Sequence, residues 1–351
     1  MGLQFIKENI NIDFVGKRRY AYVLSGLLIL ISLASLVYKG GPEYGIDFAG
    51  GLNILIKFDK SIDLDAFKAK LAPLNLPGLQ VQRFGDESDN EFMLRVSSAE
   101  FSSESARELL NTGIGQDFNG VKYVIQSLEM VGPKVGADLR AKALDALFYV
   151  VLLISIYISG RFEQRWWTAG FMALVLSSAM YFMNMFVSAA LLPVAAIIIT
   201  LLLSWRLRLN YALGAVIALI HDVFITVGVF SLLNKEIDLN VVAALLTVLG
   251  YSLNDTIIVF DRIRENIHAK HFRTLAETIN RSVNQTLSRT VLTSGVTLLS
   301  VLALYLFGGG VINDFAFALL VGIVVGTYSS IFVASPIVLA FSSRQEAEQK
   351  A

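Results

Sequence analysis

The chain has 351 residues, of which 55% are hydrophobic and 17% are charged, and its formal net charge is zero. With a mean hydropathy of +0.61, it is too apolar and too sparsely charged for an ordinary soluble protein, so its composition predicts a polytopic membrane protein. The balanced charge gives no case for nucleic-acid binding. There is no cysteine to form a disulfide or a thiolate metal site, and the three histidines lack metal-ligand spacing, so neither a metal nor a cofactor is expected.

Residues 1–38 predict a cytoplasmic segment followed by a first membrane helix. Lys17, Arg18 and Arg19 precede an apolar run from Tyr20 to Tyr38, which is about long enough to span a bilayer. A signal peptide is the alternative, but the run is followed by KGGPEYGIDF, which is not a small-residue cleavage site. The basic residues place the N-terminus inside.

Residues 39–142 are the only long polar region and predict a small α+β domain outside the membrane. Patterns typical of strands lie at 50–57, 79–84, 91–97 and 121–130, and patterns typical of helices lie at 64–71 and around 103–110. The resulting order, βαββαβ, favours a ferredoxin-like split βαβ fold.

Glycine-bearing motifs connect this domain to the membrane at both of its ends. GIDFAGG occupies 45–51 and VGPKVGADL occupies 131–139. Paired glycines permit backbone conformations that are closed to other residues. A phosphate-binding loop is the weaker interpretation, because a strand rather than a helix N-terminus follows the first motif. We expect the domain to move as a rigid body on hinges at Gly45, Gly50, Gly51, Gly132, Pro133 and Gly136.

Residues 143–341 predict a helical bundle in the membrane. Its apolar runs are 143–160, 168–184, 187–205, 211–233, 240–260, 284–307 and 315–341. Every short loop then carries its Lys and Arg residues on one side of the membrane, with Lys235 as the exception. Together with the first helix, this pattern predicts eight spans, both termini in the cytoplasm, and a charged cytoplasmic tail at 342–351.

His221 and Asp222 lie inside one of these apolar runs. They are candidates for a proton relay, because histidine titrates near neutrality. Neighbouring residues on a helix point about 100° apart, which disfavours a direct pair between them. A structural, hydrogen-bonded role is the other interpretation.

The stretch GYSLNDTIIVFDRIREN, residues 250–266, places Asn254 and Asp255 among apolar residues of a predicted membrane helix. A carboxylate at bilayer depth costs at least about 2.5 kcal/mol, so Asp255 indicates ion or proton handling. A buried structural polar group is the alternative. Arg289 is the only charge in the polar stripe of the next helix, which favours a couple with Asp255, whereas snorkelling to the cytoplasmic headgroups is its other interpretation.

In the last helix, Gly322, Gly326 and Ser330 follow a small-xxx-small spacing. This spacing permits a close contact with a neighbouring helix and says little about function.

Several motifs together resemble the SecF family, the smaller subunits of the bacterial SecD–SecF complex, over residues 1–160 and 206–341. They are GIDFAGG, VGPKVGADLRAKAL (131–144), His221-Asp222, the 250–266 stretch, and SRTVLTS (288–294) with LYLFGGG (304–310). The resemblance implies an inner-membrane subunit that works with SecD and uses the proton motive force to help the Sec translocon export unfolded polypeptides. It also implies that Asp255 and Arg289 take part in proton flow, and that the family's other key acidic residue lies in SecD.

Residues 168–205 fall outside the resemblance, as an insertion between the second and third family-like helices. Neither half contains a charge. If the insertion crosses the membrane an even number of times, the basic loop after residue 261 stays on the cytoplasmic side. The sequence therefore predicts a two-span hairpin at the edge of the bundle. It turns near Asn184 and Met185 and takes no share in the proton route.

The sequence disfavours two other classes of function. A stand-alone proton-coupled exporter of the resistance-nodulation-division type is disfavoured by the single modest external domain. A membrane enzyme is disfavoured because no nucleophile, base and oxyanion set is recognisable.

Overall fold

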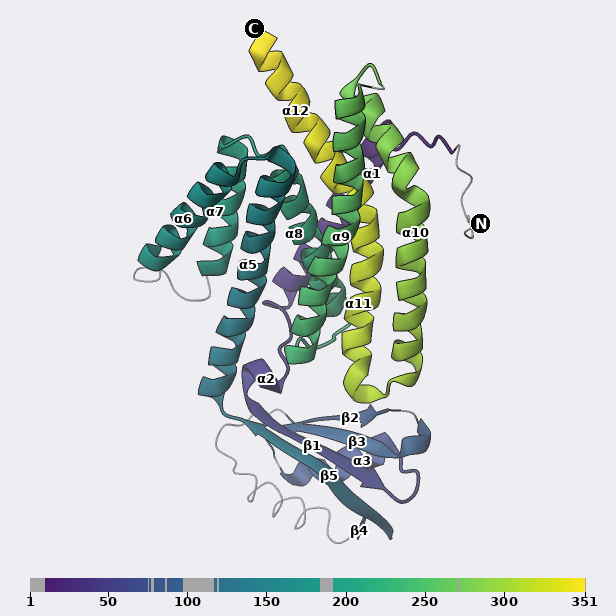
Figure 1. Ribbon diagram of the computed structural model, residues 1–351. Coiled ribbons are helices and arrows are strands. Elements are labelled where there is room, and N and C mark those ends of the chain that lie inside the picture. Colours follow the sequence, from purple (N-terminus) through teal and green to yellow (C-terminus); the bar gives the residue numbers. More distant parts are fainter. Residues whose placement is uncertain are drawn as a thin grey trace.

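The computed structural model describes residues 10–74, 76, 79–85, 87–96, 117–118, 120–183, 192–270 and 272–350. It consists of a bundle of long helices with a small antiparallel sheet at one end (Figure 1). The start of the first helix and the last helix lie at the opposite end of the bundle from the sheet (Figure 1).

Six helical stretches among the described residues are long and apolar enough to cross a membrane. Five are single helices: α1 (Arg18–Tyr38), α5 (Pro133–Glu163), α8 (Asn210–Leu232), α9 (Leu239–Ala269) and α10 (Leu275–Phe307). The sixth is continuous through α11 (Gly310–Ser329), a π-helical turn (Ser330–Ala334) and the first part of α12 (Ser335–Lys350). The protein is therefore a multi-pass membrane protein.

Two shorter apolar helices, α6 (Trp166–Met183) and α7 (Leu192–Arg206), account for most of the predicted hairpin. They lie beside α5 at one edge of the bundle (Figure 1). The 15 residues of α7 extend about 22 Å, less than the roughly 30 Å of a hydrocarbon core. The predicted turn at Asn184 and Met185 lies outside the described residues, and the count of eight spans stays a prediction.

The sheet has the strand order β2-β3-β1-β5-β4. Its strands are β1 (Gly51–Phe58), β2 (Gln80–Phe84), β3 (Glu91–Val96), β4 (Asp117–Phe118) and β5 (Val121–Val131). Both β1 and β2 run antiparallel to β3, so they are parallel to each other, and α3 (Leu64–Leu71) forms the crossover between them. This is the first half of a split βαβ unit. The second helix, expected around 103–110, lies outside the described residues, so the ferredoxin-like assignment stays a prediction.

Alternation of side chains explains why this sheet forms. Leu52, Ile54 and Ile56 of β1 are buried against α3, while the residues between them face the other way. Phe58, Phe67 and Phe92 meet edge to face in this core. Full burial of each aromatic ring contributes roughly 1.5–3 kcal/mol, which is enough for a small sheet to hold its own core.

The two connections between the domain and the membrane helices meet at a single point. Gly51 at the start of β1 pairs with Val131 at the end of β5. Gly50 and Gly51 have φ angles of +76° and +134°, which L side chains rarely adopt. A Cβ on Gly50 would lie 2.9 Å from the Cα of Pro133, so the entry and exit segments are packed against each other.

Candidate functional site

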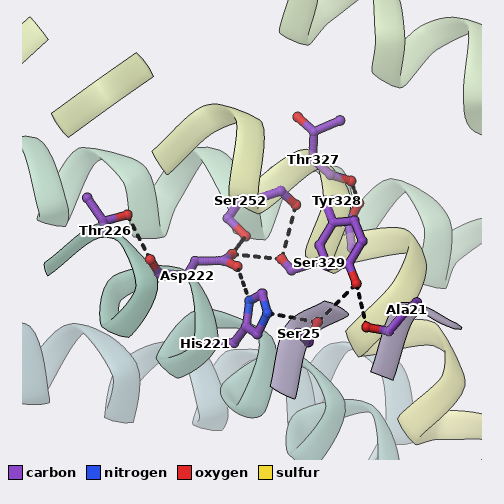
Figure 2. A network of polar contacts seen from close by, with 11 residues as sticks. Ala21, Ser25, His221, Asp222, Thr226, Ser252, Thr327, Tyr328 and Ser329 are labelled. Atoms are coloured by element: carbon purple, nitrogen blue, oxygen red, sulfur yellow. Dashed lines mark hydrogen bonds and ion pairs between the residues drawn. The ribbon is translucent and has the colours of Figure 1, made fainter. Parts of the chain in front are cut away.

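A network of buried polar side chains crosses the centre of the bundle (Figure 2). Its centre is Asp222 of α8, whose side chain is completely buried. One carboxylate oxygen, Oδ2, accepts hydrogen bonds from Ser252 of α9 at 2.6 Å and from Ser329 of α11 at 2.7 Å. The other oxygen, Oδ1, lies 2.9 Å from Nδ1 of His221.

The network continues from His221 to the first helix. Nε2 of His221 lies 3.1 Å from Oγ of Ser25, and Ser25 lies 3.0 Å from the hydroxyl of Tyr328. Tyr328 in turn donates to the backbone carbonyl of Ala21 at 2.8 Å (Figure 2). Side chains from α1, α8, α9 and α11 therefore share one set of hydrogen bonds.

The direction of these bonds fixes the number of protons in the network. Tyr328 donates its single hydroxyl proton to the carbonyl of Ala21. Ser25 must therefore donate to Tyr328, and it accepts from Nε2–H of His221. Nδ1 of His221 and Oδ1 of Asp222 must then share one proton across their 2.9 Å contact. Whether that proton sits on nitrogen or on oxygen, the pair has no net charge, which lowers the cost of burying it.

The expectation that His221 and Asp222 would pair poorly is wrong. The two side chains are enclosed in the bundle, and Nδ1 of His221 and Oδ1 of Asp222 satisfy each other despite their adjacent positions. The need to satisfy buried polar groups outweighs the angular separation of neighbours on a helix.

Asp255 of α9 is the second completely buried carboxylate. Its Oδ2 accepts a hydrogen bond from Ser294 of α10 at 3.1 Å, and Thr327 of α11 hydrogen-bonds Ser294 at 2.8 Å. Its Oδ1 is buried with no hydrogen-bond partner among the described residues. An unsatisfied buried polar atom costs about 1–3 kcal/mol, and more when it carries charge, so this arrangement favours the protonated, neutral form of Asp255.

Three consecutive residues of α11 lie between the two carboxylates. Thr327 belongs to the Asp255 cluster, whereas Tyr328 and Ser329 belong to the Asp222 network. The α-helix changes to a π-helical turn at the next residue, Ser330. Such turns are frequent at functional sites.

Glycine brings α11 close enough to α9 to form these contacts. A Cβ on Gly322 would lie 2.2 Å from Cγ2 of Val248, and one on Gly326 would lie 2.8 Å from Cβ of Ser252. The close contact that the small-xxx-small spacing permits is present.

Asn254 and Arg289 are exposed on the surface of the bundle. Both residues are described, and Arg289 forms no ion pair with Asp255 in this structure, but it lies close enough for its charge to act on that carboxyl group, so the couple stays a prediction. The inward face of α10 carries Thr290 and Ser294, and Arg289 lies about 100° around the helix from Thr290.

Several members of the site were not singled out from the sequence: Ser25, Ser294, Thr327, Tyr328 and Ser329. The run TYSS at 327–330, four hydroxyl residues in an apolar helix, is the sequence signal for the α11 residues. Ser252 lies three residues before Asp255 on α9, and it binds Asp222. In the described part of the chain, no group of three or more His, Asp or Glu side chains is placed to hold a metal ion.

Comparison with known families gives two matches along the chain. Residues 113–188 and 182–344 match the family described as "Protein export membrane protein SecD/SecF, C-terminal". Residues 39–62 match the "SecD/SecF GG Motif". The first match is therefore in two pieces that overlap at 182–188 and together extend across 168–205, the stretch that was expected to fall outside the resemblance.

Full-length relatives carry the same family name. The chain is 38% identical to the protein translocase subunit SecF of Calditerrivibrio nitroreducens, with 97% of each chain covered. It is 39% identical to that of Rhodothermus marinus, with 98% of each covered.

A solved structure resembles the whole chain. The crystal structure of SecDF, a translocon-associated membrane protein from Thermus thermophilus, matches with a TM-score of 0.70 and 31% identity. The match covers 97% of this chain and 40% of the SecDF chain. The chain therefore belongs to the SecD/SecF family of protein-export membrane proteins, as a SecF.

Proposed function

We propose that this chain is the SecF subunit of a complex that draws on the proton motive force to help the Sec translocon export unfolded polypeptides. Relatives named protein translocase subunit SecF support the export role. SecD is the proposed partner, because the chain matches 40% of a solved SecDF chain and its relatives are named SecF. The proposed location is the bacterial inner membrane, with both termini in the cytoplasm and Lys17, Arg18 and Arg19 inside.

The observation that carries the proton coupling is the buried, half-satisfied carboxyl group of Asp255. Burial favours the neutral form of a carboxyl group, whereas a nearby cation favours the charged form. Approach of Arg289 toward Asp255 would drive a proton off, and its withdrawal to the exposed position seen here would let Asp255 take one up. This alternation is the proposed switch.

Exposed polar groups on α9 and α10 support a helical partner at this surface. Asn254 and Arg289 face outward from helices that are apolar enough to span a membrane. Polar groups at such a depth are expensive in lipid and are favoured where another helix covers them. We propose that a helix of SecD packs over Asn254 and Arg289, and that an acidic residue of SecD completes the proton route.

His221 and Asp222 are proposed as a relay beside Asp255. Their shared proton can move between Nδ1 and Oδ1 without changing the net charge of the pair. A purely structural role, joining α1 and α11 to α8, is the competing proposal, since the same bonds tie these helices together.

The test is export into membrane vesicles with and without an imposed proton gradient. Asp255→Asn should leave the complex with SecD assembled but abolish the stimulation of export by the gradient. Arg289→Lys keeps the charge but loses the planar guanidinium, and should lose part of that stimulation. Normal gradient-dependent export by Asp255→Asn would contradict the proposal.

A matched control lies on the same helix. Asp261 of α9 is partly exposed and pairs with Arg161 at 3.3 Å. Asp261→Asn removes an acidic side chain from α9 without touching the buried carboxylates, and should retain gradient-dependent export.

A further inference from the structure

The five-residue loop Asn234–Asp238, between α8 and α9, contacts the sheet, two membrane helices and the linker at the base of the external domain. Its contacts are Asn234 with Lys39 at the end of α1, Lys235 with Asp314 near the start of α11, Glu236 with Arg95 of β3, and Ile237 with the segment that leads out of α1. No other short loop among the described residues joins the sheet to the membrane helices by an ion pair.

Backbone hydrogen bonds reinforce this junction. The amide of Gly45 donates to the carbonyl of Ile237 at 2.9 Å, and the amide of Ile237 donates to the carbonyl of Glu43 at 2.7 Å. One turn later, Asp47 accepts from the amide of Leu239 at 3.0 Å. The loop therefore adds a short parallel bridge to the linker just before the glycine pair.

The ion pair between Arg95 and Glu236 is a second attachment of the domain, separate from the pivot at which its two covalent connections meet. Both covalent connections of the domain meet where Gly51 pairs with Val131. A body attached at one point is free to tilt, and a further contact off that point fixes its angle. Arg95 lies on β3, beside β1 in the sheet, and supplies that contact.

This contact is only partly satisfied, which suits a reversible restraint. The Arg95 side chain is 20% exposed and lines a cavity of about 670 Å³ between the sheet and the outer ends of α10 and α11. Its Nε is buried with no partner in the described part of the structure, and burial lowers the pKa of the guanidinium. Desolvation of the guanidinium opposes the attraction within the pair, as a reversible restraint requires.

The loop also joins the two helices that carry the buried carboxylates. α8, with Asp222, ends just before it, and α9, with Asp255, begins just after it. Asp238 caps α9 by accepting from the amide of Val241 at 2.8 Å. Burial raises the pKa of Asp238, as expected for a carboxyl group enclosed between the domain and the bundle.

We propose that the loop Asn234–Asp238 is a latch that sets the angle of the external domain through Glu236 and Arg95, and passes movements of α8 and α9 to that domain. The transmission step rests on the proposed proton-driven function, whereas the latch itself does not.

The experiment measures the domain angle directly in the full chain purified with SecD and reconstituted in lipid. The chain has no native cysteine, so Lys60→Cys beyond β1 and Tyr38→Cys at the end of α1 can carry spin labels. Both positions are exposed. The distance distribution between the labels reports tilting of the domain, with no dependence on export or on a proton gradient.

We expect a narrow distribution with the native pair and a broader, shifted one in Glu236→Gln and in Arg95→Gln. The exchanged pair, Arg95→Glu with Glu236→Arg, should restore the narrow distribution. Lys57→Gln removes the 2.9 Å ion pair with Glu91 inside the domain and should leave the distribution unchanged.

An unchanged distribution in both Glu236→Gln and Arg95→Gln would overturn the latch. That result would leave the role of Asp255 untouched, just as normal gradient-dependent export by Asp255→Asn would leave the latch untouched. The two proposals can therefore fail separately.

Discussion

Asp222 and Asp255 are equally buried, but their hydrogen-bond partners give them different properties. Asp222 has a partner for each oxygen and shares a proton with His221, so it is held in place. Asp255 has one bonded and one unbonded oxygen, so a change in its surroundings can change its charge. Buried hydroxyl groups differ in the same way. Removing one that has a hydrogen-bond partner should lower the free energy of unfolding more than removing one that has none.

Ser329→Ala should lower the free energy of unfolding by about 1–3 kcal/mol, because Oδ2 of Asp222 loses one of its two hydroxyl donors. Ser155 on α5 is the control, since its buried hydroxyl has no partner among the described residues. Ser155→Ala should be neutral or slightly stabilising. Thermal unfolding of the purified complex compares the two, and equal effects would contradict the account of the Asp222 network.

At the scale of elements, the contact between α9 and α11 holds the site together. Gly322 and Gly326 allow α11 to approach, and the same approach puts Ser329 within reach of Asp222 and Thr327 within reach of Ser294. Any side chain at Gly322 would have to displace Val248, whose branched side chain is buried and stiff.

Gly322→Ala should therefore destabilise the protein by roughly 1–3 kcal/mol, as overpacking does in other cores. Gly295 of α10 is the matched control, because a Cβ there would meet nothing within 4 Å. Gly295→Ala should stabilise by about 0.5–1 kcal/mol, since alanine is the better helix former. If thermal unfolding shows that both substitutions change the stability in the same direction, the close contact of α9 and α11 is not what positions the site.

The topology of α6 and α7 is a separate question at this scale. We predict that both cross the membrane, although α7 is short, because both are uncharged before Arg206. Asn184→Cys, one residue beyond α6, would carry the only thiol in the chain and should react with an impermeant maleimide from outside. Arg206→Cys should react only from the cytoplasmic side. Labelling of Asn184→Cys from the cytoplasmic side alone would refute the hairpin.

Sequence patterns predicted the elements better than the site. The strands from β1 to β3 and the helix α3 follow from alternation and from the Leu64, Phe67, Leu71 stripe, because one local pattern governs each element. Asp255 and Asp222 were found from the cost of placing carboxylates in apolar runs. The hydroxyl partners of the His221–Asp222 pair, Ser25 and Ser329, come from α1 and α11, about 200 and 100 residues away, so only tertiary packing brings them together.

At the scale of the whole molecule, the sheet domain meets the bundle where its two connections pair and at the proposed latch. The glycine motifs at 45–51 and 131–139 remain the predicted hinges, and the latch lies beside them. In the proposed mechanism, movements of α8 and α9 reach the domain through a latch that opens and closes.

A covalent link should therefore lock the motion. Arg95→Cys with Glu236→Cys replaces the ion pair, and joining the two thiols with a short, reducible crosslinker should abolish gradient-stimulated export without loss of the folded complex. Reduction of the same sample restores movement and serves as its control. Undiminished export with the crosslink fully formed would argue against domain movement as the output.

Proton uptake by Asp255 is the central claim, and infrared difference spectroscopy of the reconstituted complex tests it most directly. Acidifying the outer side should produce a band from a newly protonated carboxyl group. That band should be absent in Asp255→Asn and present in Asp261→Asn, whose side chain is partly exposed and pairs with Arg161. A band that persists unchanged in Asp255→Asn would contradict the account.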